Sequence, residues 1–172
     1  MDPYVQLARN TIETYIRSRK VYIPDEEELT QEMKTVRAGA FVSIHENGEL
    51  RGCIGTIEAV RENLAQEIIS NAISASTRDP RFPPIRKDEL DDLEISVDVL
   101  TQPEPIQSKS QLDVKRYGVI VEKDFRRGLL LPDLEGVDSV GYQVYIARKK
   151  AGIADHEKGV SMYRFEVIRH EQ

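Results

Sequence analysis

Residues 38–58 read "AGAFVSIHENGELRGCIGTIE", and two runs rich in β-branched and apolar residues flank the dipeptide Asn47-Gly48. Asn-Gly is strongly favoured in two-residue hairpin turns, because both central residues of such a turn need a positive φ. This stretch therefore predicts a β-hairpin, and the other elements of the fold are predicted on either side of it.

The register of this hairpin decides which side chains surround Cys53, the single cysteine of the chain. A two-residue turn would place Val42 opposite Cys53 and Ile44 opposite Arg51. Because directly opposed residues share a face, Arg51 and Cys53 would point the same way and His45 would point to the other face. A nucleophilic thiol normally works with a nearby base, and this register separates the thiol from the nearest histidine.

Two glycines, Gly52 and Gly55, stand beside the cysteine in a segment that otherwise predicts a strand. Glycine weakens a strand, because it has no side chain to pack and loses much conformational freedom on ordering. Its repeated use indicates that a ligand, or another part of the protein, approaches this backbone closely. We expect the two glycines to open a groove in which the second half of the chain, or a ligand, contacts the cysteine strand.

Three further elements are predicted in the first half of the chain. Residues 3–19 favour a helix, with Asp2 placed to cap it and Pro3 at its first position. Residues 61–76, "RENLAQEIISNAISAS", carry apolar residues at helical spacing. Residues 93–100, "LEISVDVL", alternate apolar and polar side chains, which is typical of a strand with one solvated face.

The second half repeats this order of elements. Residues 117–132 predict strand, polar turn and strand, residues 137–152 predict a helix, and residues 161–170 predict an alternating strand. We therefore predict an α+β fold of two lobes built from a pseudo-duplicated ββαβ unit, with mainly antiparallel sheets flanked by helices. The single domain spans 1–172, with lobes at about 38–101 and 117–168 and the helix 3–19 packed on them. Gly52 corresponds to Gly128 in this duplication.

Composition excludes several classes of protein. The net charge of −6 and the pI of about 5.2 argue against general nucleic-acid binding. The basic clusters "KDFRRG" (123–128) and "ARKKAG" (147–152) are typical of a solvated turn and a helix C-terminus, although they leave a contact with RNA open. No apolar run approaches the roughly 20 residues of a membrane span, and the N-terminus does not resemble a secretory signal. A cytoplasmic location is expected.

The sequence gives little support for a bound metal ion or cofactor. One cysteine and three scattered histidines offer no metal-ligand spacing, and no phosphate-binding glycine loop or Rossmann fingerprint is present. We predict neither a metal nor a cofactor. Cys53 itself has two interpretations: a packed, inert residue, since free cysteine is usually buried, or a nucleophile whose thiolate is favoured by Arg51.

The segment "STRDPRFPPI" (76–85) is a second candidate site. Asp79 before a proline can form a turn by accepting hydrogen bonds from its own backbone. In one interpretation Asp79 and Arg81 line a cleft beside the cysteine strand and bind a polar ligand or partner. In the other they form an internal ion pair that pins a loop, with Phe82 buried as an anchor.

Six segments in this order resemble the AMMECR domain family, whose prokaryotic members are called protein A of the AmmeMemoRadiSam system. They are "LRGCIG" (50–55), "DPRFPPI" (79–85), "DELDDLEISVDVL" (88–100), "PEPI" (103–106), "GLLLP" (128–132) and "KKAGI" (149–153). Many relatives have a cysteine and a tryptophan near the last helix, and this chain has neither there. The resemblance implies a two-lobed α+β fold and association with a Memo-type protein and a radical-SAM enzyme.

Two functions follow as hypotheses. The first is a binding or accessory module that presents a groove between the lobes, around "LRGCIG", to a Memo-type or radical-SAM partner. The second is a cysteine-dependent enzyme with Cys53 as the catalytic nucleophile. The candidate binding residues, which the resemblance supplies, are Arg51, Gly52, Ile54, Gly55, Asp79, Arg81 and Phe82.

Overall fold

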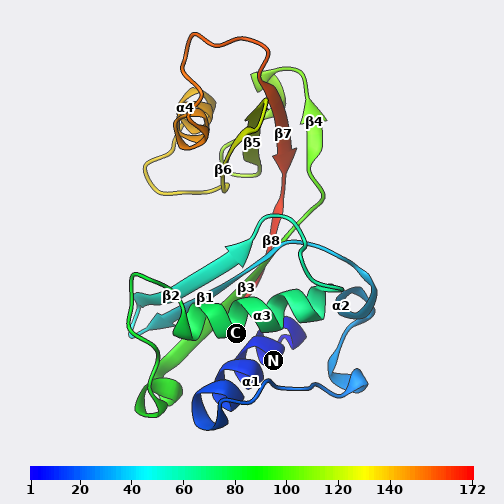
Figure 1. The fold of residues 1–172 in the computed structure, drawn as a ribbon, viewed down its shortest axis with the longest axis vertical. Coiled ribbons are helices and arrows are strands. Elements are labelled where there is room, and N and C mark those ends of the chain that lie inside the picture. Colours follow the sequence, from blue (N-terminus) through cyan, green and yellow to red (C-terminus); the bar gives the residue numbers. More distant parts are fainter. The chain divides into compact units, whose positions relative to one another are not determined.

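The computed structural model describes residues 1–172, which form two compact units. The first unit comprises residues 1–100 and 168–172, and the second comprises residues 101–167. Each unit holds one four-stranded antiparallel sheet, so the predicted α+β class with two sheets flanked by helices is confirmed (Figure 1). None of the helices combines the length and the apolar character needed to span a bilayer.

The first sheet has the strand order β2-β1-β3-β8. Its strands are β1 (Ala40–Glu46), β2 (Glu49–Thr56), β3 (Leu93–Leu100) and β8 (Val167–His170). The helices of this part of the chain are α1 (Pro3–Ser18), η1 (Glu26–Glu28), α2 (Gln31–Thr35), α3 (Leu64–Thr77) and η2 (Lys87–Asp92).

Helices α1 and α3 lie side by side on one face of the first sheet (Figure 1). The α1 helix begins as predicted, because the carboxylate of Asp2 accepts hydrogen bonds from the backbone N–H groups of Tyr4 and Val5. Apolar side chains of both helices and of alternate strand residues form one continuous core. This arrangement leaves the other face of the sheet without a helix from its own unit.

The turn of the β1–β2 hairpin forms as predicted. Asn47 and Gly48 have φ values of 53° and 82°, and Glu46 pairs with Glu49. Both positive φ values are those that a two-residue turn of this kind requires.

Beyond the turn, one extra residue in β2 changes the register. His45 lies opposite Leu50, whereas its neighbour Ile44 lies opposite Gly52, so Arg51 has no partner in β1. This is a β-bulge, in which two residues of one strand face one residue of the other. The predicted register, with Ile44 opposite Arg51, is therefore wrong.

The bulge moves Cys53 to the other face of the sheet. Cys53 pairs with Ser43 rather than with Val42, which is fully buried beneath the helices. Since residues alternate along β1, His45 shares the face of Ser43 and Cys53. The prediction that His45 points away from the thiol depends on a hairpin without the bulge and is also wrong.

Gly52 is required by the packing of α3. A Cβ atom at this position would lie 2.2 Å from the backbone oxygen of Ala75, so only glycine lets the helix approach. At Gly55 a Cβ atom would lie 2.2 Å from the ring of Phe41, which covers the backbone there. The two glycines thus make room for other parts of the first unit. Their presence is explained by this packing and not by the predicted groove for a ligand or for the second half of the chain.

The second sheet has the order β4-β7-β5-β6. Its elements are β4 (Glu104–Ile106), η3 (Lys109–Gln111), β5 (Gly118–Lys123), β6 (Arg126–Leu130), α4 (Val140–Ala151) and β7 (Ser161–Phe165). A Cβ atom at Gly128 would lie 2.1 Å from the backbone oxygen of Ala147 in α4. Gly52 and Gly128 therefore occupy equivalent places, which supports the predicted duplication.

Each sheet contains three strands of one repeat and a fourth strand that follows the other repeat along the chain. β4 follows β3 but pairs with β7, whereas β8 follows β7 and lies beside β3. The two connecting segments are bonded to each other, because Thr101 donates its N–H to the oxygen of Glu166 and accepts the N–H of Glu166 on its hydroxyl. The sequence predicted one strand for residues 161–170, and the structure divides it at Glu166.

We expect the Gly52→Ala protein to be less stable than the wild type by about 1–3 kcal/mol, because the added methyl group overlaps a helix carbonyl that cannot move alone. Urea unfolding measures this loss. Gly141→Ala is the matched control, since no atom lies within 4 Å of the place that a Cβ atom would take at this helical glycine, and it should gain about 0.5–1 kcal/mol. Equal unfolding midpoints for Gly52→Ala and the wild type would contradict the packing argument.

Candidate functional site

The helix-free face of the first sheet carries mostly polar side chains, and we call it the polar face. Strand pairing arranges it in three rows across β2, β1 and β3. The rows are Gly55, Phe41 and Asp98; Cys53, Ser43 and Ser96; and Leu50, His45 and Glu94. A thiol and two hydroxyl groups therefore follow one another across the middle of this face.

Cys53 is half-buried, and its Sγ atom lies 3.2 Å from the Oγ atom of Ser43. A hydroxyl at this distance makes a hydrogen bond with the sulfur, but it is neutral and a weak base. His45 lies two residues along β1 from Ser43 and is a diagonal neighbour of Cys53; such neighbours are typically about 7–8 Å apart. The side chain of His45 makes no hydrogen bond, so no base is engaged with the thiol.

The loop after α3 holds the backbone of Cys53 on the outer edge of β2. The carboxylate of Asp79 accepts the N–H of Cys53 at 3.0 Å, and the guanidinium of Arg81 donates to the oxygen of Cys53 at 3.3 Å. Asp79 and Arg81 thus bind the two backbone groups that a neighbouring strand would bind. An edge strand left open would present these groups to other chains.

Asp79 and Arg81 are also joined to each other. Arg81 donates to Asp79 from its backbone N–H at 3.0 Å and from its guanidinium at 3.0 and 2.8 Å. These charge-assisted bonds from Arg81, together with the N–H of Cys53, hold the pKa of the buried Asp79 well below its usual range. The internal ion pair that was one of the two interpretations of this loop is therefore present.

Arg51 faces the loop that follows α3 and not the thiol. Its guanidinium donates to Glu89 at 3.1 and 3.3 Å and to the backbone oxygens of Pro83 and Pro84 at 2.8 and 3.3 Å. The side chains of Arg51 and Glu89 are only 13% and 11% exposed. The prediction that Arg51 points with Cys53 and favours its thiolate is wrong, because the bulge turns Arg51 toward this loop.

The remaining predicted residues have different surroundings. Ile54 packs against the core beneath the helices, and Gly55 lies under the ring of Phe41. Phe82 is half-buried, with the guanidinium of Arg81 5.4 Å from the centre of its ring. The structure therefore brings Cys53, Asp79 and Arg81 together. Arg51 instead holds the loop after α3 by hydrogen bonds, and Gly52 and Ile54 have roles in packing.

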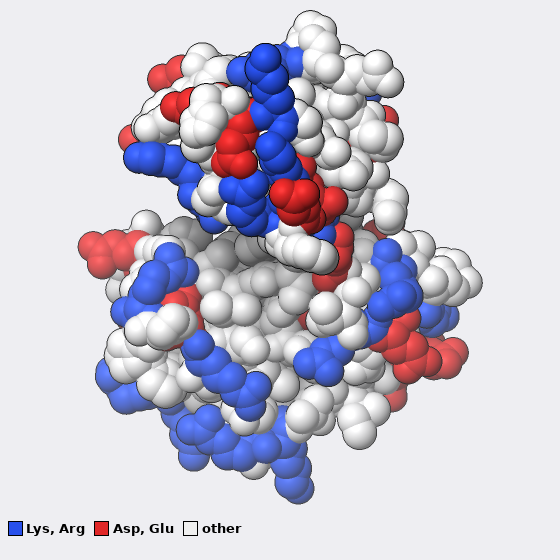
Figure 2. All heavy atoms as spheres, turned by 45° about the horizontal axis from the view of Figure 1, so that its top comes forward, with Lys and Arg blue, Asp and Glu red and all other residues white.

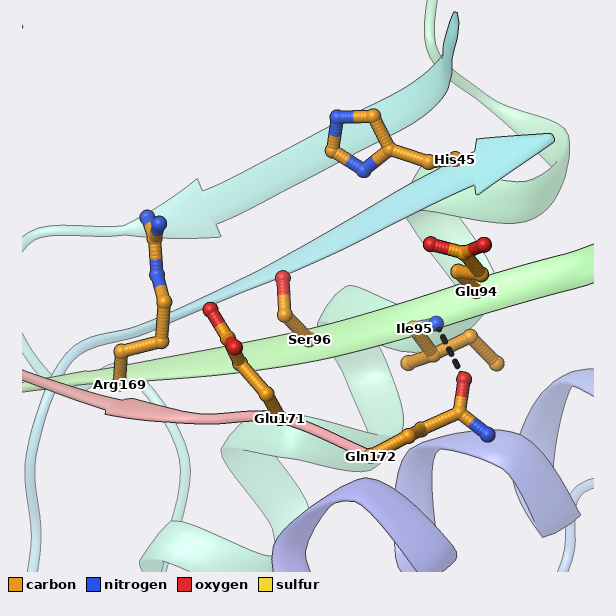
Figure 3. A pocket seen from close by; sticks show the side chains of 7 residues that line it. All are labelled: His45, Glu94, Ile95, Ser96, Arg169, Glu171 and Gln172. Atoms are coloured by element: carbon orange, nitrogen blue, oxygen red, sulfur yellow. Dashed lines mark hydrogen bonds between the residues drawn. The ribbon is translucent and has the colours of Figure 1, made fainter. Parts of the chain in front are cut away.

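A cavity of about 330 Å³ opens on the polar face beside this site (Figure 3). Its polar side chains are His45, Glu94, Ser96, Arg169, Glu171 and Gln172. Sequence reasoning did not find it, because three of these residues come from the C-terminal end of the chain. No spacing along the sequence indicates that β8 returns to lie beside β3.

Several of the charged groups elsewhere are paired. In the predicted basic turn, Arg126 lies 2.7 Å from Glu157, and Arg127 lies 3.6 Å from Glu122. Acidic side chains also lie directly beside many of the basic ones on the face shown in Figure 2. No group of three or more His, Cys, Asp or Glu side chains is placed to hold a metal ion.

A family model described as AMMECR1 matches residues 5–170. A protein of Thermotoga maritima is 54% identical over 170 residues, which are 98% of this chain and 97% of that protein. A protein of Clostridium acetobutylicum is 47% identical over 99% of this chain, which spans only 36% of that longer protein. The crystal structure of an uncharacterized protein from Pyrococcus horikoshii has a TM-score of 0.85 and 32% identity, covering 98% of this chain and 89% of that one.

We expect Asp79→Asn to lower the free energy of unfolding by about 2 kcal/mol at pH 7, because a charged acceptor of four hydrogen bonds is lost. A carboxyl group with a depressed pKa stabilises the fold above its unfolded pKa, and this contribution is lost as the pH falls. The difference from wild type should therefore shrink as the pH falls below about 4.

Urea unfolding between pH 7 and pH 3 measures this dependence. Asp88→Asn is the control, since the Asp88 side chain is 73% exposed and pairs only with Arg86. Its difference from the wild type should stay small throughout. Parallel stability profiles for wild type and Asp79→Asn would show that Asp79 does not act as described.

Proposed function

The chain belongs to the AMMECR1 family, and from the geometry of the Cys53 site we propose that it is a binding or accessory module. In this proposal the polar face around residues 50–55 contacts a protein partner. The partner classes are a Memo-type protein or a radical-SAM enzyme, which the family resemblance suggests. Every residue of the proposed face belongs to the first unit.

The observation that carries this proposal is the attachment of the Cys53 backbone to Asp79 and Arg81. Both backbone groups of Cys53 on the strand edge are occupied, so the segment is held in one conformation. A surface fixed before binding loses little entropy when a partner associates with it. Such a rigid edge suits recognition, and the edge groups at Cys53 are not left open for pairing with another strand.

The surroundings of the thiol favour binding over catalysis. Its polar neighbour is the hydroxyl of Ser43, and the nearest arginine in sequence, Arg51, is engaged with Glu89. Catalysis by a cysteine requires an activating base or cation positioned toward the sulfur. Leu50, 39% exposed at the end of the same face, adds an apolar contact of the kind found in protein interfaces.

We expect the protein to bind the Memo-type protein or the radical-SAM enzyme of the same genome in isothermal titration calorimetry. Leu50→Glu should weaken this binding by about tenfold or more, because it replaces an apolar contact with a charge. Ile23→Glu is the control, since Ile23 is 85% exposed and lies outside the sheet. Absence of binding to both proteins, or equal losses in the two variants, would refute the proposal.

A cysteine-dependent enzyme is the second candidate, and one observation favours it. Cys53 is half-exposed, and the guanidinium of Arg81 reaches the backbone oxygen of the same residue. A cation is thus held beside the cysteine, although it is Arg81 and not the predicted Arg51. Substrate would have to supply or recruit the base that the site lacks.

The rate of alkylation by iodoacetamide at pH 7 separates the two candidates. For a binding module we expect Cys53 to react no faster than glutathione, because its sulfur is hydrogen-bonded to a neutral hydroxyl. Mass spectrometry follows the labelling, and Cys53→Ser confirms that this residue is the site modified. Labelling many times faster than that of glutathione would favour the enzyme.

A further inference from the structure

The cavity on the polar face is lined by groups that the Cys53 site does not use. His45 and Glu94 are neighbours on β1 and β3, Ser96 follows two residues along β3, and Glu171 comes from the end of the chain. Figure 3 shows Ser96, Arg169 and Glu171 extending to the same side of the sheet. The cavity lies wholly within the first unit.

The charges in this cavity do not balance. Arg169 donates two hydrogen bonds to Asp98, at 2.8 and 2.9 Å, and this partner is almost fully buried. The positive charge of Arg169 is therefore matched by Asp98. The carboxylates of Glu94 and Glu171 have no ion pair or hydrogen bond within the protein. Two negative charges thus remain at the cavity without a counter-charge.

The hydrogen-bonding groups of the cavity also favour a positively charged ligand, because they offer mainly acceptor atoms. Two free carboxylates, the hydroxyl of Ser96 and the imidazole of His45 all offer acceptor atoms. An anionic ligand would meet two like charges, and a metal ion would lack a set of three closely grouped ligands. An ammonium group provides one positive charge and three N–H donors, which suits these acceptors.

We propose that this cavity binds an aliphatic ammonium group. Its volume is at the lower end of the range for ligand pockets, about 300–1,000 Å³, which suits a side chain or a small amine. The cavity adjoins the row of Cys53, because Ser43 pairs with both Cys53 and Ser96. If the ammonium belongs to a partner lysine, this inference rests on the proposed function and identifies one contact of that interface.

The test titrates the complete protein with n-butylammonium chloride and records amide shifts by NMR, at constant ionic strength set with sodium chloride. We expect saturable shifts at residues 45, 94, 96 and 171. Glu94→Gln and Glu171→Gln should each weaken binding about fivefold, the effect of removing one solvent-exposed ion pair. The double variant Glu26→Gln/Glu27→Gln changes two exposed carboxylates elsewhere and should bind as the wild type does.

Shifts that do not saturate, or that sodium chloride alone reproduces, overturn the proposal. Equal weakening in the Glu26/Glu27 control overturns it as well. A second arm compares acetyl-Gly-Lys-Gly-amide with the same peptide acetylated on its lysine, and equal binding of the two also overturns it. A lysine peptide that binds more tightly than n-butylammonium supports a protein-borne lysine, whereas equal affinity supports a free amine.

These measurements need no partner protein, so their outcome is independent of the calorimetry on the Memo-type and radical-SAM proteins. Saturable ammonium binding without any partner binding would remove the proposed function and leave the cavity assignment intact. Partner binding without ammonium binding would remove the cavity assignment and leave the proposed function intact.

Discussion

The approach of α3 to β2 at Gly52 is the constraint on which the rest of the first unit depends. The helix carbonyl at Ala75 occupies the space that any side chain at Gly52 would need. Ala75 lies four residues before Asp79, so this close contact brings the end of α3 to the outer edge of β2. The carboxylate of Asp79 can therefore reach the N–H of Cys53, and the site is a direct consequence of how the helix packs.

The same contact occurs in the second unit, where Gly128 lies under Ala147 of α4. There, however, the hairpin has no bulge, and Leu129 takes the place that Cys53 has in β2. The shared glycine shows what the ββαβ scaffold requires. The bulge, the thiol and the loop that binds its backbone belong to the first repeat alone, so the scaffold does not require them.

Local signals in the sequence predicted most elements. Asn47-Gly48 indicated the hairpin, and Asp2 indicated the start of α1, because turn and cap geometries depend on adjacent residues. The bulge at Arg51 was missed, since an extra residue in a strand leaves no mark in an alternating pattern, and the face of Cys53 was assigned wrongly as a result. The cavity was missed for another reason, because Arg169 and Glu171 join it through pairing between distant segments.

β4 and β8 each complete the sheet of the other repeat, and this topology can be traced to an ancestral dimer. A single ββαβ chain with one trailing strand would complete two such sheets by pairing with a second copy and trading that strand, as in a domain-swapped homodimer. Gene duplication and fusion would then convert the symmetric dimer into one continuous chain with this topology.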